Sequence, residues 1–180
     1  MNRTAATVLG LSLAGFLLPS CVQTDLNAPP NLRLGRDECI ECGMIISEDR
    51  CSAAMVLNNE GVREPALFDD IGCMLDYARE HPEKTTPTGF VHDHSTRAWV
   101  PLDKAWFALI DETKIKTPMG SGIVAFGRRP DAESLAAAYA GTVIDYASLP
   151  AARKAWMEAR YGSPDRAPIG ASLSPTGGDK

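Results

Sequence analysis

The feature that most constrains the fold is a strand–strand–helix–strand order that occurs twice along the chain. In the first half, strand-like runs at 51–57 and 62–68 flank a turn signal rich in Asn and Gly, so they are predicted to form a hairpin. A helix capped by Asp69 or Asp70 comes next, and a third strand begins at Gly89. Strands that alternate with helices in this way predict an α+β fold with helices packed on antiparallel sheets.

The second half repeats the order. Strands are predicted at 105–110 and 123–126, a helix starts at Pro130-Asp131, and a last strand covers 142–146. Between the first two strands lies a polar loop at 111–120. The apolar spacing of the helix predicts a buried face made of Leu135, Ala138 and Tyr139.

We therefore expect two similar ββαβ units packed together, followed by a C-terminal helix. The predicted parts of the chain are a signal peptide (1–20), a flexible tether (21–37), the two units (38–95 and 96–147), the helix (148–162) and a disordered tail (163–180).

The N-terminus has the pattern of an export signal. Arg3 precedes an apolar run at 8–18, which is shorter than the roughly 20 residues needed to span a bilayer. The run ends in Leu18-Pro19-Ser20-Cys21, which resembles the lipobox of bacterial lipoproteins, and lipidation of Cys21 would anchor the chain to a membrane. A plain exported protein with Cys21 as a chance neighbour is the alternative. Either way the sequence predicts a periplasmic location, and the lipid could lie in the inner or the outer membrane.

Sulfur ligands are concentrated in the segment from Cys39 to Met44, which reads CIECGM. Cys39 and Cys42 are spaced to face one metal ion, and Gly43 allows a tight backbone path to the thioether of Met44. Soft thiolate and thioether ligands favour Cu(I), whereas zinc binds thioethers poorly. A disulfide, a four-cysteine zinc site and a thioredoxin-type redox pair remain alternatives for the same residues.

A second candidate ligand is Met119. It lies between Pro118 and Gly120 in a loop and belongs to no apolar stripe, so we expect an exposed thioether that binds metal; packing of the loop is the alternative. The other methionines of the mature chain are predicted to be packing residues: Met55, Met74 and Met157.

The remaining cysteines and histidines give weaker indications. Cys51 and Cys73 are expected to pack in the core or to form a disulfide. His92 and His94 alternate around Asp93 and share a strand face, so they are weaker metal-ligand candidates; a solvated strand end is the alternative.

Composition and motifs exclude several function classes. The formal net charge of −5 argues against a nucleic-acid-binding surface, which needs excess positive charge. The sequence has no GxSxG, HExxH, P-loop or GxGxxG motif, and Asp69-Asp70 is better interpreted as a helix start than as an acid–base pair. We therefore do not expect an enzyme.

Taken in order, the lipobox, CIECGM, FDDIGCMLDY and TPMGSGIVAF resemble the nitrous oxide reductase accessory lipoprotein family, NosL, over roughly residues 35–146. The resemblance implies a double ββαβ fold that is also related to part of organomercurial lyase. It implies a Cu(I) carrier in which Cys42 and Met119 are the metal ligands. Cys39 and Met44 belong to the same motif.

The same resemblance implies the partners. These are a membrane ABC-type assembly complex with its periplasmic protein and, directly or indirectly, periplasmic nitrous oxide reductase, whose copper–sulfide centre would receive the ion. A second copy of the chain is a further candidate partner. Two other functions stay open: a periplasmic thiol–disulfide oxidoreductase that uses Cys39 and Cys42, and a structural lipoprotein held by disulfides.

Overall fold

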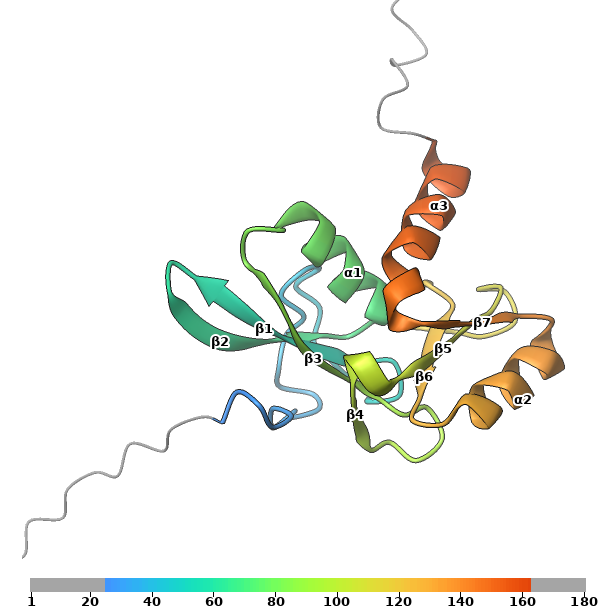
Figure 1. Cartoon of the computed structure of the whole chain (residues 1–180), viewed down its shortest axis with the longest axis horizontal. Helices are drawn as coiled ribbons and strands as arrows, with labels where there is room; N and C mark the ends of the chain where they lie inside the picture. The colour runs from blue at the N-terminus through green and yellow to red at the C-terminus, as the bar shows by residue number, and fades with distance from the viewer. Residues whose placement is uncertain (1–24, 163–180) are drawn as a thin grey trace, which may run out of the picture.

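The computed structural model describes residues 25–162, which form two antiparallel sheets and three α-helices (Figure 1). In chain order the elements are β1 (Ala53–Asn59), β2 (Val62–Phe68), α1 (Ile71–Glu80), β3 (Thr85–His92), β4 (Trp99–Pro101), η1 (Leu102–Lys104), β5 (Trp106–Leu109), β6 (Ile123–Phe126), α2 (Arg129–Tyr139), β7 (Thr142–Asp145), η2 (Tyr146–Ser148) and α3 (Leu149–Tyr161). The predicted signal peptide, Cys21 and the C-terminal tail lie outside the described residues. Between residues 25 and 162, no helix has the length and apolar character that crossing a membrane requires.

The two sheets have the same topology, which confirms the predicted α+β fold. The first is ordered β2-β1-β3-β4 and the second β6-β5-β7. In each unit the first strand is therefore central and pairs with the second and third strands of its own unit. The short strand β4 adds to the edge of the first sheet, where Val100 lies opposite Val91. This strand was not predicted.

The third strand starts earlier than the sequence suggested. It begins at Thr85 rather than Gly89, across a stretch that contains Pro87. The register between β1 and β3 shifts between Met55 and Leu57, opposite this stretch. Because proline has no N–H to donate, it is tolerated at such an irregularity.

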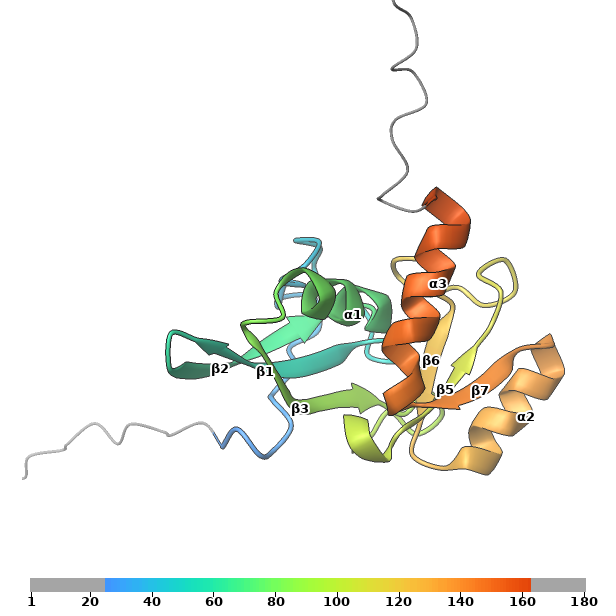
Figure 2. The same ribbon diagram turned by 45° about the horizontal axis from the view of Figure 1, so that its top comes forward.

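The helices of the two units, α1 and α2, were predicted with different success. Helix α1 begins after Asp70, as expected, and buries Ile71, Met74 and Leu75. It lies over the first sheet, and α2 lies beside the second (Figure 2). The predicted buried face of α2 is wrong in part, because Ala138 and Tyr139 are exposed, Leu135 is only partly buried, and the buried residues are Ala132 and Ala136. Positions 132, 135 and 136 share a helix face, from which residue 138 points away.

One core joins the two units. It includes Phe68 and Val91 from the first sheet and Phe107 and Ile123 from the second. A bridge between Asp93 and Ala125 also connects them.

The buried Asp93 strengthens this union. The Asp93 carboxylate accepts hydrogen bonds from the backbone N–H groups of Ser95, Thr96 and Gly127. Although burial opposes ionisation, these donors together hold the pKa of Asp93 below its ordinary value. Separately, Arg153 of α3 pairs with Asp76 of α1 at 2.7 Å and joins the C-terminal helix to the first unit.

The segment predicted as a tether is in contact with the body of the protein from residue 25 onward. Residues 25, 26 and 28–31 line a hollow of about 170 Å³ together with Met55 and Phe90. Leu32 packs against the main core, and the Arg33 backbone N–H donates to the Asp37 carboxylate at 2.7 Å. These contacts fix the segment that leads into the sulfur-rich loop.

Candidate metal centre

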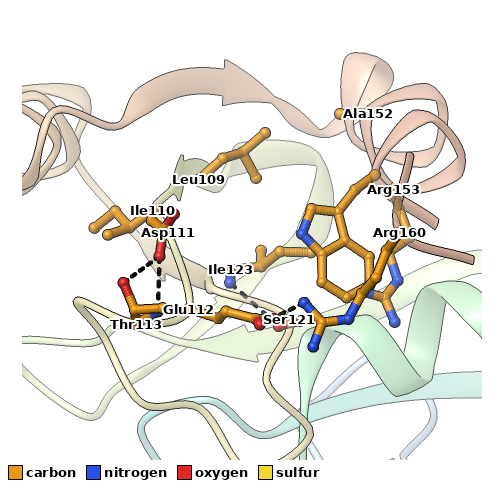
Figure 3. Close-up of a pocket in the computed structure, with 11 residues that line it drawn as sticks. Leu109, Ile110, Asp111, Glu112, Thr113, Ser121, Ile123, Ala152, Arg153 and Arg160 are labelled. Atoms are coloured by element: carbon orange, nitrogen blue, oxygen red, sulfur yellow. Dashed lines mark hydrogen bonds and ion pairs between the residues drawn. The ribbon is translucent and has the colours of Figure 1, made fainter. Parts of the chain in front are cut away.

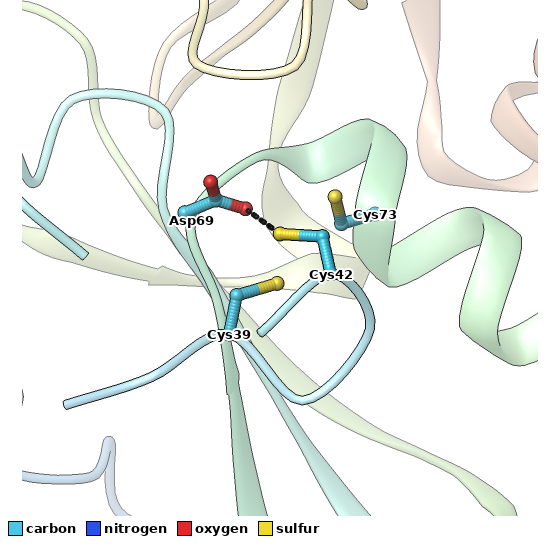
Figure 4. Close-up of side chains that lie close together, drawn as sticks. All are labelled: Cys39, Cys42, Asp69 and Cys73. Carbon is cyan, nitrogen blue, oxygen red and sulfur yellow. Dashed lines mark hydrogen bonds between the residues drawn. The ribbon is translucent and has the colours of Figure 1, made fainter. Parts of the chain in front are cut away.

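Four side chains of the first unit that could bind a metal ion lie close together. The Sγ atoms of Cys39, Cys42 and Cys73 and a carboxylate oxygen of Asp69 all lie within 4.8 Å of one another. They come from three elements: the loop before β1, the end of β2 and the first turn of α1 (Figure 4). We call these four residues the thiol cluster.

The loop that carries Cys39 and Cys42 is closed by its own backbone. Glu38 and Ile45 form an antiparallel bridge, and the Cys39 N–H donates to the Met44 carbonyl at 2.8 Å. Gly43 has a φ of 72°, a left-handed conformation that most residues avoid, and its N–H donates to the Cys39 carbonyl at 2.8 Å. The chain thereby turns back within four residues and directs both thiols to the same side (Figure 4).

A backbone hydrogen bond between distant residues places this loop beside the end of β2. The Ile40 N–H donates to the carbonyl of Leu67, near the end of β2, at 3.0 Å. Asp69 follows that strand at once, and its Oδ1 accepts the Cys42 thiol at 3.6 Å. Cys73, three residues after the Asp70 cap, completes the cluster from the helix.

The thiols have different exposure and acidity. Cys39 and Cys73 are buried, at 1% and 4% exposure, whereas Cys42 is only partly buried. Hydrogen bonding between the Cys39 and Cys73 thiols lowers the pKa of Cys39 to about 7 and raises the pKa of Cys73 above its ordinary value. Burial raises the pKa of the Cys42 thiol to about 11. The thiolate form is therefore favoured at Cys39, whose pKa is lowered, and the thiol form at Cys42, whose pKa is raised.

Asp70 links the cluster to the loop that contains Met119. One carboxylate oxygen of Asp70 accepts the Gly72 N–H at 2.6 Å and caps α1, while the other accepts the Met119 N–H at 2.9 Å. A Cβ at Gly72 would lie 2.7 Å from the Cβ of Ser121, so only glycine lets this loop approach the helix so closely. The Met119 loop is thus held against the start of α1, next to the thiol cluster.

The two predicted methionine ligands lie at the surface. Met44 is 49% exposed and Met119 is 42% exposed. Met44, Asp69 and residues 116–118 line one hollow of about 330 Å³. Both thioethers are therefore accessible from outside, whereas Cys39 and Cys73 are not.

Two members of the thiol cluster were not predicted as site residues. Cys73 was expected to pack or to form a disulfide; it does contact the core, yet it is a free thiol that faces Cys39. Asp69 was interpreted only as part of a helix start, a role that Asp70 performs alone. The sequence does show that Cys73 lies in the first helical turn after Asp70. It does not show that the Ile40–Leu67 hydrogen bond brings the loop of Cys39 and Cys42 close to that turn.

The histidines lie elsewhere. His92 is buried, its Nδ1 is 2.7 Å from the Ser52 hydroxyl, and its ring stacks on Trp99 at 3.6 Å. His94 packs against Phe126, with 5.8 Å between the ring centroids. Burial lowers the pKa of both imidazoles. Neither belongs to the thiol cluster, and His92 is not the solvated strand end that was the alternative.

The other sulfur residues have packing roles. Cys51 is buried in a second core beneath α2, and burial raises its pKa to about 12. Met55 and Met74 are buried as predicted, and Met157 on α3 is partly buried. Among residues 25–162, all four cysteines are free thiols.

A separate cavity of about 400 Å³ lies between α3 and the loop after β5 (Figure 3). Trp156 and Arg153 line it from the helix, and Ser121 lines it from the loop. Arg160 pairs with Glu112 at its rim. No residue of the thiol cluster lines this cavity, so it is distinct from the candidate metal centre.

Comparison with known proteins gives concordant results. The model of one protein family, described as NosL, matches residues 33–153. The copper-binding lipoprotein NosL of Stutzerimonas stutzeri is 28% identical over 187 residues, which cover 95% of each chain. The crystal structure of the copper chaperone NosL from Shewanella denitrificans has a TM-score of 0.52 and 22% identity, covering 66% of this chain and 96% of that one. This last similarity shows a shared fold.

Proposed function

Because the chain belongs to the NosL family, we propose that it is a copper chaperone that carries Cu(I). The observation that carries the proposal is the thiol cluster, in which Cys42 is partly exposed and to which the Met119 loop is linked through the hydrogen bond from the Met119 N–H to Asp70. Thiolate and thioether sulfur are soft donors that prefer Cu(I) to hard cations. The names of two relatives, a copper-binding lipoprotein and a copper chaperone, support the same cargo.

The geometry suits carriage better than permanent storage. We propose that Cys42 and Met119 hold the ion, with Cys39 and Met44 as further ligands of the same site. Cys42 is partly exposed and both thioethers are accessible, so an incoming ligand from a partner can reach the ion and replace one donor at a time. A closed four-ligand zinc site leaves no such open position.

The proposed destination is the copper–sulfide centre of nitrous oxide reductase, reached through a membrane ABC-type assembly complex. Around the loop of Cys39 and Cys42, the large apolar side chains of Ile40, Met44 and Ile45 are exposed. Exposed apolar groups gathered at one place are typical of a protein contact surface. Lipidation of Cys21 in the periplasm would confine the carrier to the membrane and raise its effective concentration near a membrane-bound acceptor.

A thiol–disulfide oxidoreductase is less well supported. Such an enzyme needs an accessible thiol of low pKa as its nucleophile. In this site the thiol with the lowered pKa, Cys39, is buried, whereas the accessible thiol, Cys42, has a raised pKa. The thiol with the lowered pKa is therefore not the thiol that a substrate can reach.

The proposal is tested by anaerobic titration of the reduced mature chain with Cu(I) against a chromophoric chelator. We expect one tightly bound ion per chain, and we expect Cys42→Ser and Met119→Ala each to weaken binding at least about tenfold, since each removes a ligand. Cys51→Ser and Met157→Ala are matched controls, because both residues lie outside the site.

The possible results distinguish an error in the proposed ligands from an error in the proposed function. Wild-type affinity in Met119→Ala would keep the carrier but remove the loop methionine from the site. Failure of the wild-type chain to compete with the chelator would overturn the proposed function.

A further inference from the structure

The thiol cluster and the two methionines differ in depth, although they belong to one site. Cys39 and Cys73 are among the most buried residues of the protein, while Met44 and Met119 are exposed. Cys42 is intermediate, and its sulfur lies within 4.8 Å of both buried thiols. An ion held by Cys39 and Cys73 therefore has two buried ligands, whereas an ion held by Cys42 and the thioethers has ligands that a partner can reach.

We propose that the carried Cu(I) ion has two positions, an inner one between Cys39 and Cys73 and an outer one at Cys42 with the thioethers. The inner position would retain the ion, and the outer one would release it. This inference rests on the proposed function and adds Cys73 to the ligands named there.

The spacing of the buried thiols fits a copper ion. Metal–thiolate bonds are about 2.3 Å long, so two in line separate the sulfur atoms by about 4.6 Å and a trigonal arrangement separates them by about 4.0 Å. The sulfur atoms of the thiol cluster already lie within 4.8 Å of one another. The cluster is therefore compact enough for two of its sulfur atoms to bind one copper ion.

The two sets of ligands also differ in how firmly they are held. Cys39 is fixed by the hydrogen bonds that close its loop, and Cys73 lies in the first turn of α1. Met44 and Met119 are exposed, and a methionine side chain has three rotatable bonds with which to follow an ion. A rigid buried pair suits retention, and flexible surface thioethers suit transfer.

Movement between the positions is a ligand exchange without electron transfer. The Cys42 thiol loses its proton and binds copper as the bond to Cys39 or Cys73 breaks, and a thioether then replaces the second buried thiolate, so copper remains Cu(I). Each released thiolate takes up one proton, one from the Cys42 thiol and one from solvent. Because a new bond forms as each old bond breaks, the ion is never free.

The inference is tested on the reduced mature chain loaded with one equivalent of Cu(I) under anaerobic conditions. Release of the ion to an excess of a chromophoric Cu(I) chelator is followed by stopped flow, and X-ray absorption reports the sulfur ligands. We expect Cys73→Ala and Cys39→Ser to keep one bound ion but to release it at least about tenfold faster. We expect the double variant Met44→Leu/Met119→Leu to bind the ion less tightly at equilibrium but to pass it to the chelator at least about tenfold more slowly, because the outer position through which the ion leaves is lost. Cys51→Ser, another buried cysteine, should behave as wild type.

The controls distinguish the possible failures. If Cys73→Ala and Cys39→Ser release copper at the rate of Cys51→Ser, the inner position is refuted while the copper carrier stands. If the wild-type chain binds no Cu(I), the proposed function itself fails. Should the cysteine variants not fold, the methionine variant decides, since it alters only exposed positions; release at the wild-type rate there would refute the outer position.

Discussion

The most informative single residue outside the ligands is Asp70, because one buried carboxylate performs two separable tasks. Its Oδ1 caps α1 by accepting the Gly72 N–H, and its Oδ2 holds the Met119 loop by accepting the Met119 N–H. Asparagine is as good a helix cap as aspartate, but it has only one oxygen. Asp70→Asn should therefore keep the cap and turn an N–H group toward the Met119 N–H.

The magnitude follows from these two bonds. A hydrogen bond to a charged acceptor contributes about 1.5–3 kcal/mol, so Asp70→Asn should lower the free energy of unfolding by about 2 kcal/mol. Asp70→Ala also loses the cap, which adds about 1 kcal/mol. For a chain of this size, each kcal/mol lowers Tm by about 2–4 °C, so we expect falls of about 6 °C and 9 °C.

The decisive assay is hydrogen exchange at the Met119 amide, combined with thermal unfolding. Loss of about 2 kcal/mol at this bond should speed local exchange roughly 30-fold in Asp70→Asn. Asp69→Asn is the matched control, because Asp69 contacts Cys42 rather than Met119. An unchanged rate of hydrogen exchange at the Met119 amide in Asp70→Asn, or equal stability of the Asn and Ala variants, would refute the assignment of separate roles to the two oxygens of Asp70.

Two further predictions concern stability. His92 and His94 have pKa values lowered by burial, so the unfolded chain binds more protons than the folded chain as the pH falls below the ordinary histidine pKa of 6.5. The stabilising effect should therefore be fully present above pH 6.5, and the free energy of unfolding should decline below it. In His92→Gln/His94→Gln, the free energy of unfolding measured by chemical denaturation should fall less steeply below pH 6.5. A pH profile identical to that of the wild type would contradict this. Gly122 has a φ of 68°, and a Cβ there would lie 2.0 Å from the Ile110 carbonyl oxygen, whereas Gly43, at a φ of 72°, has open space. We expect Gly122→Ala to cost more than about 3 kcal/mol and Gly43→Ala about 1–2 kcal/mol, measured by urea unfolding; equal costs would show that the close contact is relieved elsewhere.

Much of the fold could be predicted because it follows from local patterns. The hairpin of β1 and β2 is specified by two β-rich runs around a turn, and α1 by a cap followed by apolar residues at helical spacing. The errors arise where tertiary contacts override these patterns. Pro87 lies in a strand because the neighbouring strand is irregular at that point, and β4 is a strand because β3 offers it an edge.

The candidate site was predictable in part for the same reason. The spacing of Cys39, Cys42 and Met44 is local, so the motif alone indicates soft-metal chemistry. Met119 was identified because it lies in a loop between Pro118 and Gly120 and belongs to no apolar stripe. Cys73 fitted the buried stripe of α1 equally well as a packing residue, and nothing local distinguishes a buried thiol from a buried ligand.

The sequence by itself determined the repeated ββαβ order, the tight turn at Gly43 and the start of α1 at Asp69-Asp70, since each depends on residues close in the chain. Only the tertiary structure decided that Cys73 and Asp69 would join Cys39 and Cys42. The hydrogen bonds from Ile40 to Leu67 and from Met119 to Asp70 bring these segments together. They join residues 27 and 49 positions apart, and such pairings are selected by the packing of the whole core rather than by any local pattern.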